Sequence, residues 1–188
     1  MKKFYSMVIA AIMAVFSFSA QAEAPYLDAF AGLNFTTIDH SGVNYRVGVH
    51  LGIRGTLDMP SVAKGFYTNA AAMFTYTGFK LDSINYSPVS LVFPIHAGYK
   101  YELDLKKYLF IEAGPYFSIG LFGKSEGRNV FSKEVGYKLF DAGLGLRAGL
   151  DLNEKWIFSV GGDFGFINRL DIKRTRTSTV MASIGYRL

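Results

Sequence analysis

The chain has 188 residues, a formal net charge of +5 and no cysteine, and half of its residues are hydrophobic. The missing cysteine excludes disulfides, a cysteine nucleophile and a thiolate metal site. Without residues 1–22 the chain has 18 basic and 15 acidic side chains, a balance that gives no support to a nucleic-acid partner.

The amino terminus has the features of a secretory signal peptide. Lys2 and Lys3 precede an uncharged apolar run at 7–18, and residues 20–22, Ala-Gln-Ala, form a small-x-small cleavage site. The apolar run is too short for a membrane-spanning helix. The sequence therefore predicts a signal peptide at 1–22 and an exported domain at 23–188.

Apolar residues then alternate with glycines and charged residues, and no helical periodicity is sustained. In the clearest segment, DAGLGLRAGLDL, leucines and alanines share one parity, while glycines, Arg147 and two aspartates share the other. Eight segments have this strand pattern: 26–36, 45–57, 66–79, 89–103, 108–121, 141–152, 156–166 and 178–188.

Short and long connections alternate between these strands. Residues 104–107 and 153–155 form tight turns, whereas 123–138 and 168–177 are longer polar loops. The turn at 58–64 is longer than we expect at the end of the barrel that carries the tight turns. This alternation is typical of an outer-membrane barrel whose long loops lie outside the cell. The predicted fold is all-β, an eight-stranded antiparallel up-and-down transmembrane β-barrel.

A soluble lipocalin-like barrel or β-sandwich is the alternative, with the apolar parity facing a core. The aromatic residues favour the membrane barrel, because those on the apolar parity form two bands that resemble interfacial girdles. One band, near the tight turns, is Tyr99, Tyr101, Trp156, Phe158 and Tyr186; the other, near the long loops, is Phe35, Tyr45, Tyr76, Phe164 and Phe166.

In such a barrel the polar parity faces the lumen, and its charged residues predict an ion-pair network. Similar depth on neighbouring strands predicts that Glu112 pairs with Arg147 and that Arg187 meets Asp28 near the closure of the barrel. The predicted lumen network is Asp28, Arg46, Arg54, Glu112, Arg147, Asp163 and Arg187.

Two prolines lie inside predicted strands, where they cannot donate a ladder hydrogen bond. Pro94 and Pro115 fall nearly opposite each other when the chain is folded about the 104–107 turn. We therefore expect a bulge or gap between the strands at 89–103 and 108–121. Strand curvature and a lateral opening for lipid are both consistent with it.

The sequence contains no pattern typical of a catalytic, metal or cofactor site. His40 is flanked by Asp39 and Ser41, but neighbours in a short loop rarely converge. His50 and His96 face the predicted lumen without an evident third metal ligand. We predict no enzyme activity and no cofactor. Of three functions, a structural or surface-interaction barrel with a packed lumen is favoured over a narrow or gated porin-like channel and over a lipid-modifying enzyme.

The last long loop carries four cations that could contact phosphates of outer-leaflet lipopolysaccharide, or could form a solvated loop tip. They are Arg169, Lys173, Arg174 and Arg176.

Residues 90–120, SLVFPIHAGYKYELDLKKYLFIEAGPYFSIG, resemble the central hairpin of small barrels grouped as PorT-like or "outer membrane protein beta-barrel domain" proteins. The motifs at 93–95, 113–116 and 183–188 carry the likeness. It implies an outer-membrane barrel of a Gram-negative cell and, through the PorT likeness, a surface or secretion partner, but no shared functional residues. Such chains often end in Phe; here Leu188 closes the strand expected to meet the barrel-assembly machinery.

Overall fold

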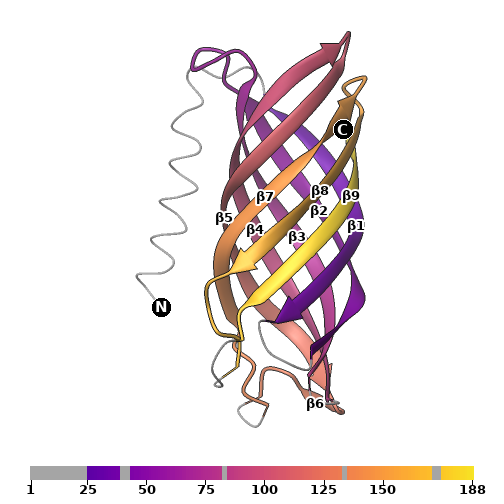
Figure 1. Ribbon diagram of the computed structural model, residues 1–188, viewed down its shortest axis with the longest axis vertical. Coiled ribbons are helices and arrows are strands. Elements are labelled where there is room, and N and C mark those ends of the chain that lie inside the picture. The colour runs from indigo at the N-terminus through magenta and orange to yellow at the C-terminus, as the bar shows by residue number, and fades with distance from the viewer. Residues whose placement is uncertain (1–24, 39–42, 82–83, 133–134, 171–174) are drawn as a thin grey trace.

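A computed structural model describes residues 25–38, 43–81, 84–132, 135–170 and 175–188; the side chains of 43–45 and 81 lie outside its description, as does the predicted signal peptide. In these ranges eight long antiparallel strands form a closed barrel (Figure 1). They are β1 (Tyr26–Ile38), β2 (Val43–Asp58), β3 (Phe66–Leu81), β4 (Ile84–Asp104), β5 (Lys107–Ser125), β7 (Phe140–Leu152), β8 (Trp156–Gly165) and β9 (Thr177–Arg187).

Each long strand pairs with its neighbours in the chain, and β1 pairs with β9 to close the barrel. The predicted tight turns connect β4 with β5 and β7 with β8 at one end, here called the turn end, where the carboxyl terminus also lies (Figure 1). The opposite end is the loop end. There the predicted loop at 123–138 is shorter than expected, since β5 extends to Ser125 and a two-residue strand, β6 (Arg128–Asn129), pairs back onto it.

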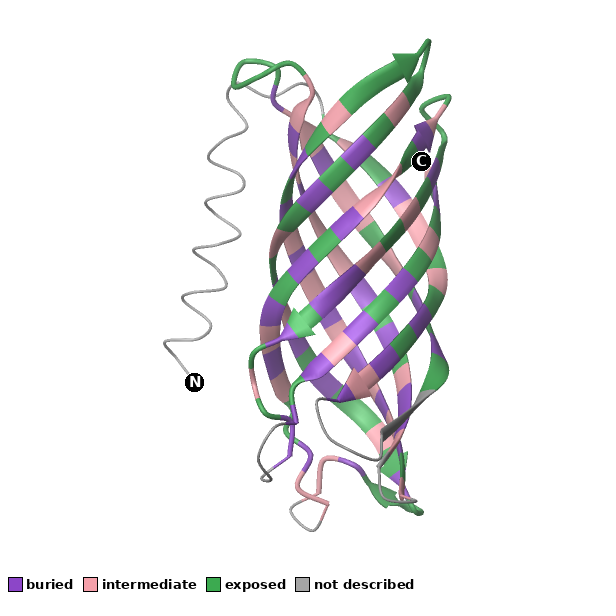
Figure 2. Ribbon diagram, viewed as in Figure 1, coloured by how far each residue is buried: buried purple, intermediate pink, exposed green. Residues whose placement is uncertain are grey.

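Burial is inverted relative to a soluble protein, as the sequence predicted. Side chains such as Leu51, Ile111 and Leu146 are about half exposed on the outer wall, whereas Asp28 and Glu112 are 0% and 3% exposed inside. Buried and exposed residues alternate along every long strand (Figure 2). An outer wall of exposed aliphatic side chains is stable in lipid, not in water.

Both aromatic bands lie on the outer wall. At the turn end the rings of Trp156 and Tyr186 meet edge to face, 5.1 Å apart, and Tyr99 and Tyr101 are exposed nearby. At the loop end the exposed aromatic residues are Phe35, Tyr76, Phe164 and Phe166. These bands place the lipid-facing surface between the two ends of the barrel.

The predicted gap between the two proline-containing strands is confirmed. The β4–β5 ladder passes from the pair Pro94–Tyr116 to the pair Ala97–Ala113 and omits the two positions between them, without a change of register. The ladder between β3 and β4 also has a gap, from Ala70–Ile95 to Met73–Val92. Pro94 borders the first gap and lies within the second, and Pro115 lies within the first, as expected of residues without a backbone N–H.

The lumen-facing glycines make room for large side chains from neighbouring strands. A Cβ on Gly98 would lie 2.4 Å from the ring of Tyr67, and one on Gly145 would lie 2.6 Å from the imidazole of His96. Glycine is therefore required where a narrow barrel must hold tyrosine, histidine and arginine side chains in its centre.

The long turn between β2 and β3 packs against the barrel instead of extending away from it. Met59 is buried, and the N–H of Lys100 donates to the carbonyl of Gly65 at 2.8 Å. Among the residues described, no helix is long and apolar enough to cross a membrane.

Candidate functional site in the lumen and at the loop end

Glu112 is the centre of a buried polar cluster in the middle of the lumen. Its carboxylate accepts hydrogen bonds from the Tyr67 hydroxyl at 2.8 Å and from the Asn69 amide at 2.7 Å. The other carboxylate oxygen lies 3.1 Å from Nδ1 of His96 and 3.8 Å from Nη1 of Arg54. Four partners from three strands thus surround one carboxylate that is shielded from water.

The predicted pair between Glu112 and Arg147 is not formed. The two residues are partners in the β5–β7 register, but the Arg147 guanidinium lies 3.0 Å from the carboxylate of Asp163 on β8. Nη1 of Arg147 also contacts the His96 ring at 3.0 Å. His96 therefore lies between two charged groups that each have another partner, and the cluster is a chain and not a single pair.

The predicted meeting of Asp28 and Arg187 is also replaced by two separate pairs. Asp28 and Arg187 are register partners on β1 and β9. Arg54 nevertheless binds both carboxylate oxygens of Asp28 at 3.0 Å, and Arg187 pairs with Asp151 while lying over the Tyr26 ring. Long arginine side chains reach diagonal neighbours as easily as direct ones.

Arg46 does not belong to the lumen network. It is exposed, and its side chain packs over Gly78, which shares the outward parity of Tyr76. A register shift in the β2–β3 ladder between Arg46 and Val49 changes the direction of the strand there. The predicted alternation therefore fails at this bulge, and Arg46 lies on the outer wall.

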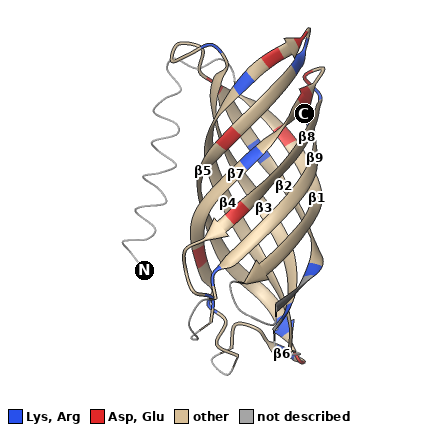
Figure 3. Ribbon diagram, in the orientation of Figure 1, with Lys and Arg blue, Asp and Glu red and all other residues tan. Residues whose placement is uncertain are grey.

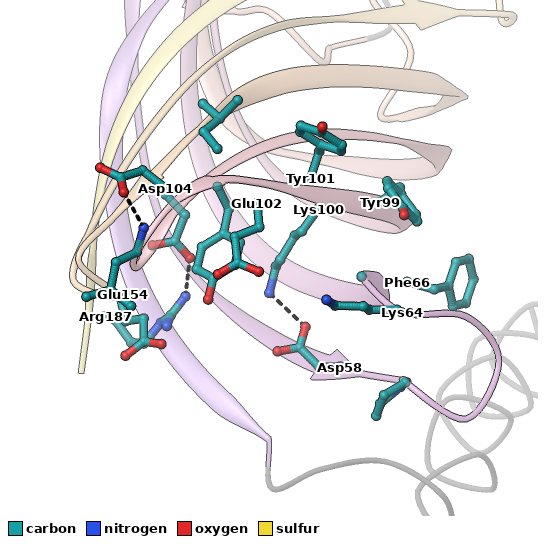
Figure 4. A pocket seen from close by; sticks show the side chains of 16 residues that line it. Asp58, Lys64, Phe66, Tyr99, Lys100, Tyr101, Glu102, Asp104, Glu154 and Arg187 are labelled. Atoms are coloured by element: carbon teal, nitrogen blue, oxygen red, sulfur yellow. Dashed lines mark hydrogen bonds and ion pairs between the residues drawn. The ribbon is translucent and has the colours of Figure 1, made fainter.

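Small cavities and buried apolar layers follow one another along the lumen. A vestibule of about 710 Å³ opens at the turn end, where Lys100 binds Asp58 at 2.7 Å (Figure 4). Beyond it, cavities lined by described residues measure about 10, 20 and 50 Å³. Three buried apolar clusters lie among them. The first is Tyr67, Phe110 and Ile157, and the second is Met73, Val92, Tyr116 and Met181.

The third apolar cluster, here called the outer cap, closes the loop end. It consists of Ile38, Phe79, Tyr86, Val130, Tyr137 and Leu170, with Ile84, Phe131 and Val135 packed against it. The Phe79 and Tyr86 rings stack 5.0 Å apart. Between the cap and the second cluster lies the 50 Å³ cavity, here called the outer chamber, whose wall includes hydroxyl groups of Thr75, Ser118 and Thr179.

The four predicted lipopolysaccharide contacts have different positions. Arg169 is only 3% exposed, and its guanidinium lies 4.4 Å from the Tyr137 ring centroid, so it is not available to lipid headgroups. Arg176 is exposed just before β9. Lys173 and Arg174 lie outside the described residues. No sequence pattern indicates that Arg169 is buried, because a cation in a polar loop is normally solvated.

The histidines have structural partners. Nε2 of His50 lies 2.8 Å from the Ser183 hydroxyl, a contact that the sequence did not predict, and Nδ1 of His50 has no hydrogen-bond partner among the described residues. A serine hydrolase needs a carboxylate at that nitrogen and space for a substrate. The adjoining cavity of about 20 Å³ is too small. His40 lies outside the description, and the described residues contain no group of three potential metal ligands.

Several members of the lumen clusters were missed from the sequence. Asp151 and Lys100 share the lumen parity of their strands, so alternation alone could have identified them. Tyr67 and Asn69 are harder to identify, since neither carries a charge at neutral pH. The charged positions recur along the barrel from end to end (Figure 3).

The closed barrel, its apolar outer wall, its aromatic bands and its polar lumen define an outer-membrane β-barrel. A family model described as "Outer membrane protein beta-barrel domain" matches residues 17–171, and the chain belongs to this family. The family match does not extend to the narrower PorT-like label. No curated protein matches the chain.

Two solved structures illustrate the likeness. Neisserial surface protein A has a TM-score of 0.61 and 15% identity, over 89% of this chain and 97% of that protein. OprG from Pseudomonas aeruginosa has a TM-score of 0.50 and 12% identity, over 89% and 97%. At such identities the likeness establishes a shared fold, and with the family match it places the protein in the outer membrane.

Proposed function

We propose that this protein is a sealed barrel that conducts no solute, catalyses no reaction and acts through the surface that it presents at the loop end. The observation that carries this proposal is the series of three buried apolar clusters separated by cavities of no more than about 50 Å³. A continuous water path would have to cross all three clusters, and an eight-stranded barrel has little room for one.

The purified, refolded protein is expected to give no conductance steps in planar bilayers. The porin-like channel makes the opposite prediction. A variant in which Met73 and Met181 are both replaced by alanine removes volume only from the second cluster, and it too is expected to remain silent because two clusters stay intact. Reproducible steps from the unmodified barrel, blocked by a large polymer, would establish a pore and end this proposal.

The outer wall at the loop end carries cations just beyond the aromatic band. Arg46 and Lys80 share the outward parity of Tyr76 on β2 and β3, and Lys124 shares the outward parity of Phe122 on β5. Arg176 is exposed before β9. The carboxylate of Glu126 is exposed in the same region. This cation belt, Arg46, Lys80, Lys124 and Arg176, supports contact with phosphates of lipopolysaccharide at the height of its headgroups.

Replacing all four belt cations by serine is expected to weaken binding of purified lipopolysaccharide by about tenfold to a thousandfold, since each cation near an anionic headgroup layer contributes up to ~1 kcal/mol. Native mass spectrometry of detergent-refolded protein measures the bound fraction. The matched control replaces four turn-end lysines, Lys64, Lys106, Lys107 and Lys155, and is expected to leave binding unchanged. Equal loss in both variants would mean that net charge, and not the belt, is responsible.

The sealed lumen does not favour the lipid-modifying alternative, since the Ser183–His50 contact is enclosed. For biogenesis, we propose that the outward residues of β9, from Val180 to Leu188, provide the segment that the barrel-assembly machinery recognises; Val180, Ile184 and Tyr186 are exposed on the outer wall.

A further inference from the structure

Arg169 connects three parts of the loop end. Its N–H donates to the carbonyl of Thr175 at 3.0 Å, and its carbonyl accepts from the N–H of Lys138 at 2.8 Å. The first bond lies within the connection between β8 and β9, and the second joins that connection to the segment that precedes β7. The guanidinium then covers the Tyr137 ring of the outer cap. One residue thus holds two loops and the cap together.

The Arg169 side chain also forms part of the wall of the outer chamber. Its Nε and Nη1 are buried and have no hydrogen-bond partner among the described residues. A buried guanidinium with unsatisfied donors is costly unless solvent reaches it. The chamber, about 50 Å³, has room for water beside these donors and the Asp141 carboxylate. Hydration of the Arg169 donors therefore favours an open arrangement, whereas stacking on Tyr137 and the main-chain hydrogen bonds favour the closed one.

The outer cap has a strand part, Ile38, Phe79 and Tyr86, and a loop part, Val130, Tyr137 and Leu170. The N–H of Val130 donates to the carbonyl of Gly123 at 3.0 Å. The Phe131 ring packs so closely on Gly120 that a Cβ on that glycine would lie 2.2 Å from the ring. Moving the loop part of the cap therefore needs no break in the ladders of the eight long strands. Burial raises the pKa of the Tyr137 phenol, so this ring stays neutral over Arg169.

We propose that the loop part of the outer cap is a lid over the outer chamber and that Arg169, stacked on Tyr137, is its latch. Opening the lid exposes the chamber to the outside of the cell. It does not create a pore, because the second apolar cluster and the Glu112 cluster lie beneath the chamber. The lid is thus a device for displaying a hydroxyl-lined recess, and it is independent of the lipopolysaccharide contacts proposed for the outer wall.

The absence of cysteine from the chain allows a direct test by single-cysteine labelling. Ser118→Cys places a thiol in the chamber wall, and Asn69→Cys places one below the second cluster. Each is combined with Arg169→Met, which keeps the long side chain but removes the cation, or with Arg176→Met as the matched control. Whole cells are treated with a small charged thiol reagent, and folding is checked by heat modifiability on gels.

Arg169→Met is expected to speed labelling at Ser118→Cys by about tenfold, because loss of the cation lowers the free energy of local opening. Arg176→Met is expected to leave the labelling rate unchanged. Asn69→Cys is expected to stay unlabelled, and bilayer conductance to stay at baseline. Unchanged labelling at Ser118→Cys, or labelling that rises equally at Asn69→Cys, overturns the latch. Tyr137→Leu removes the stacked ring but keeps apolar bulk, and it must speed labelling at Ser118→Cys as Arg169→Met does. Unchanged labelling in Tyr137→Leu overturns the latch as well. If Arg169→Met does not fold, the result for Tyr137→Leu alone decides.

Discussion

Replacing Glu112 by alanine is expected to lower the free energy of unfolding in detergent by about 3 to 5 kcal/mol, the usual cost of removing one partner from a buried ionic cluster. The carboxylate accepts from Tyr67 and Asn69 and lies beside His96 and Arg54. Its loss leaves Tyr67, Asn69 and His96 without this acceptor, whereas Arg54 keeps its pair with Asp28. Urea titration followed by tryptophan fluorescence measures the change, since Trp156 is the single tryptophan.

Glu112→Gln is the matched control for this prediction. It keeps one acceptor oxygen for Tyr67 or Asn69 but removes the charge that faces Arg54, so an intermediate loss is expected. If Glu112→Ala changes stability by less than about 1 kcal/mol, water in the lumen screens the cluster as it screens a surface pair. In that case the lumen is wetter than its small cavities indicate.

The second large effect is expected at Asp163, whose replacement by alanine leaves the Arg147 guanidinium without its carboxylate and costs about 3 to 5 kcal/mol. Adding Arg147→Met removes the orphaned charge and is expected to restore part of the loss. A double-mutant cycle measures the coupling between the two residues. Arg147 and Asp163 are only 8% and 5% exposed, so solvent cannot replace the lost contact.

The comparison cycle joins Glu112 with Arg147, which are register neighbours without a direct contact. We expect its coupling energy to be clearly smaller than that of Asp163 with Arg147, because any influence must pass through His96. Equal coupling in the two cycles would show that the lumen charges act as one undivided network and that the pairs described above do not exist as separate units.

The alternation of residue types was sufficient to predict the barrel, its eight long strands and the lumen position of six of the seven charged residues assigned to the network. It could not determine which charges pair. Partner choice depends on register and on how far a side chain reaches, so Arg147 passes its direct neighbour Glu112 and binds Asp163. The pattern also failed where the backbone leaves regular pleating, at the bulge beside Arg46.

The loop end was the least predictable part of the molecule. A cation in a polar loop gives no sequence signal of burial, and the contact of Arg169 with Tyr137 joins residues 32 positions apart in the chain. The outer cap draws residues from the ends of β1, β3 and β4 and from two loops. Such a cluster has no periodicity of its own, because its members come from three strand ends and two loops.

Three apolar clusters in series give the lumen a redundancy that a single constriction would lack. If the clusters open independently, the fraction of time for which water forms an unbroken column is the product of three small fractions. A substitution that loosens one cluster raises only the open fraction of that cluster, and the open fractions of the other two stay as they were. If the barrel is sealed as proposed, most single mutations in it leave the outer membrane's exclusion of toxic solutes intact, and the loop end can change in sequence without making the cell leak.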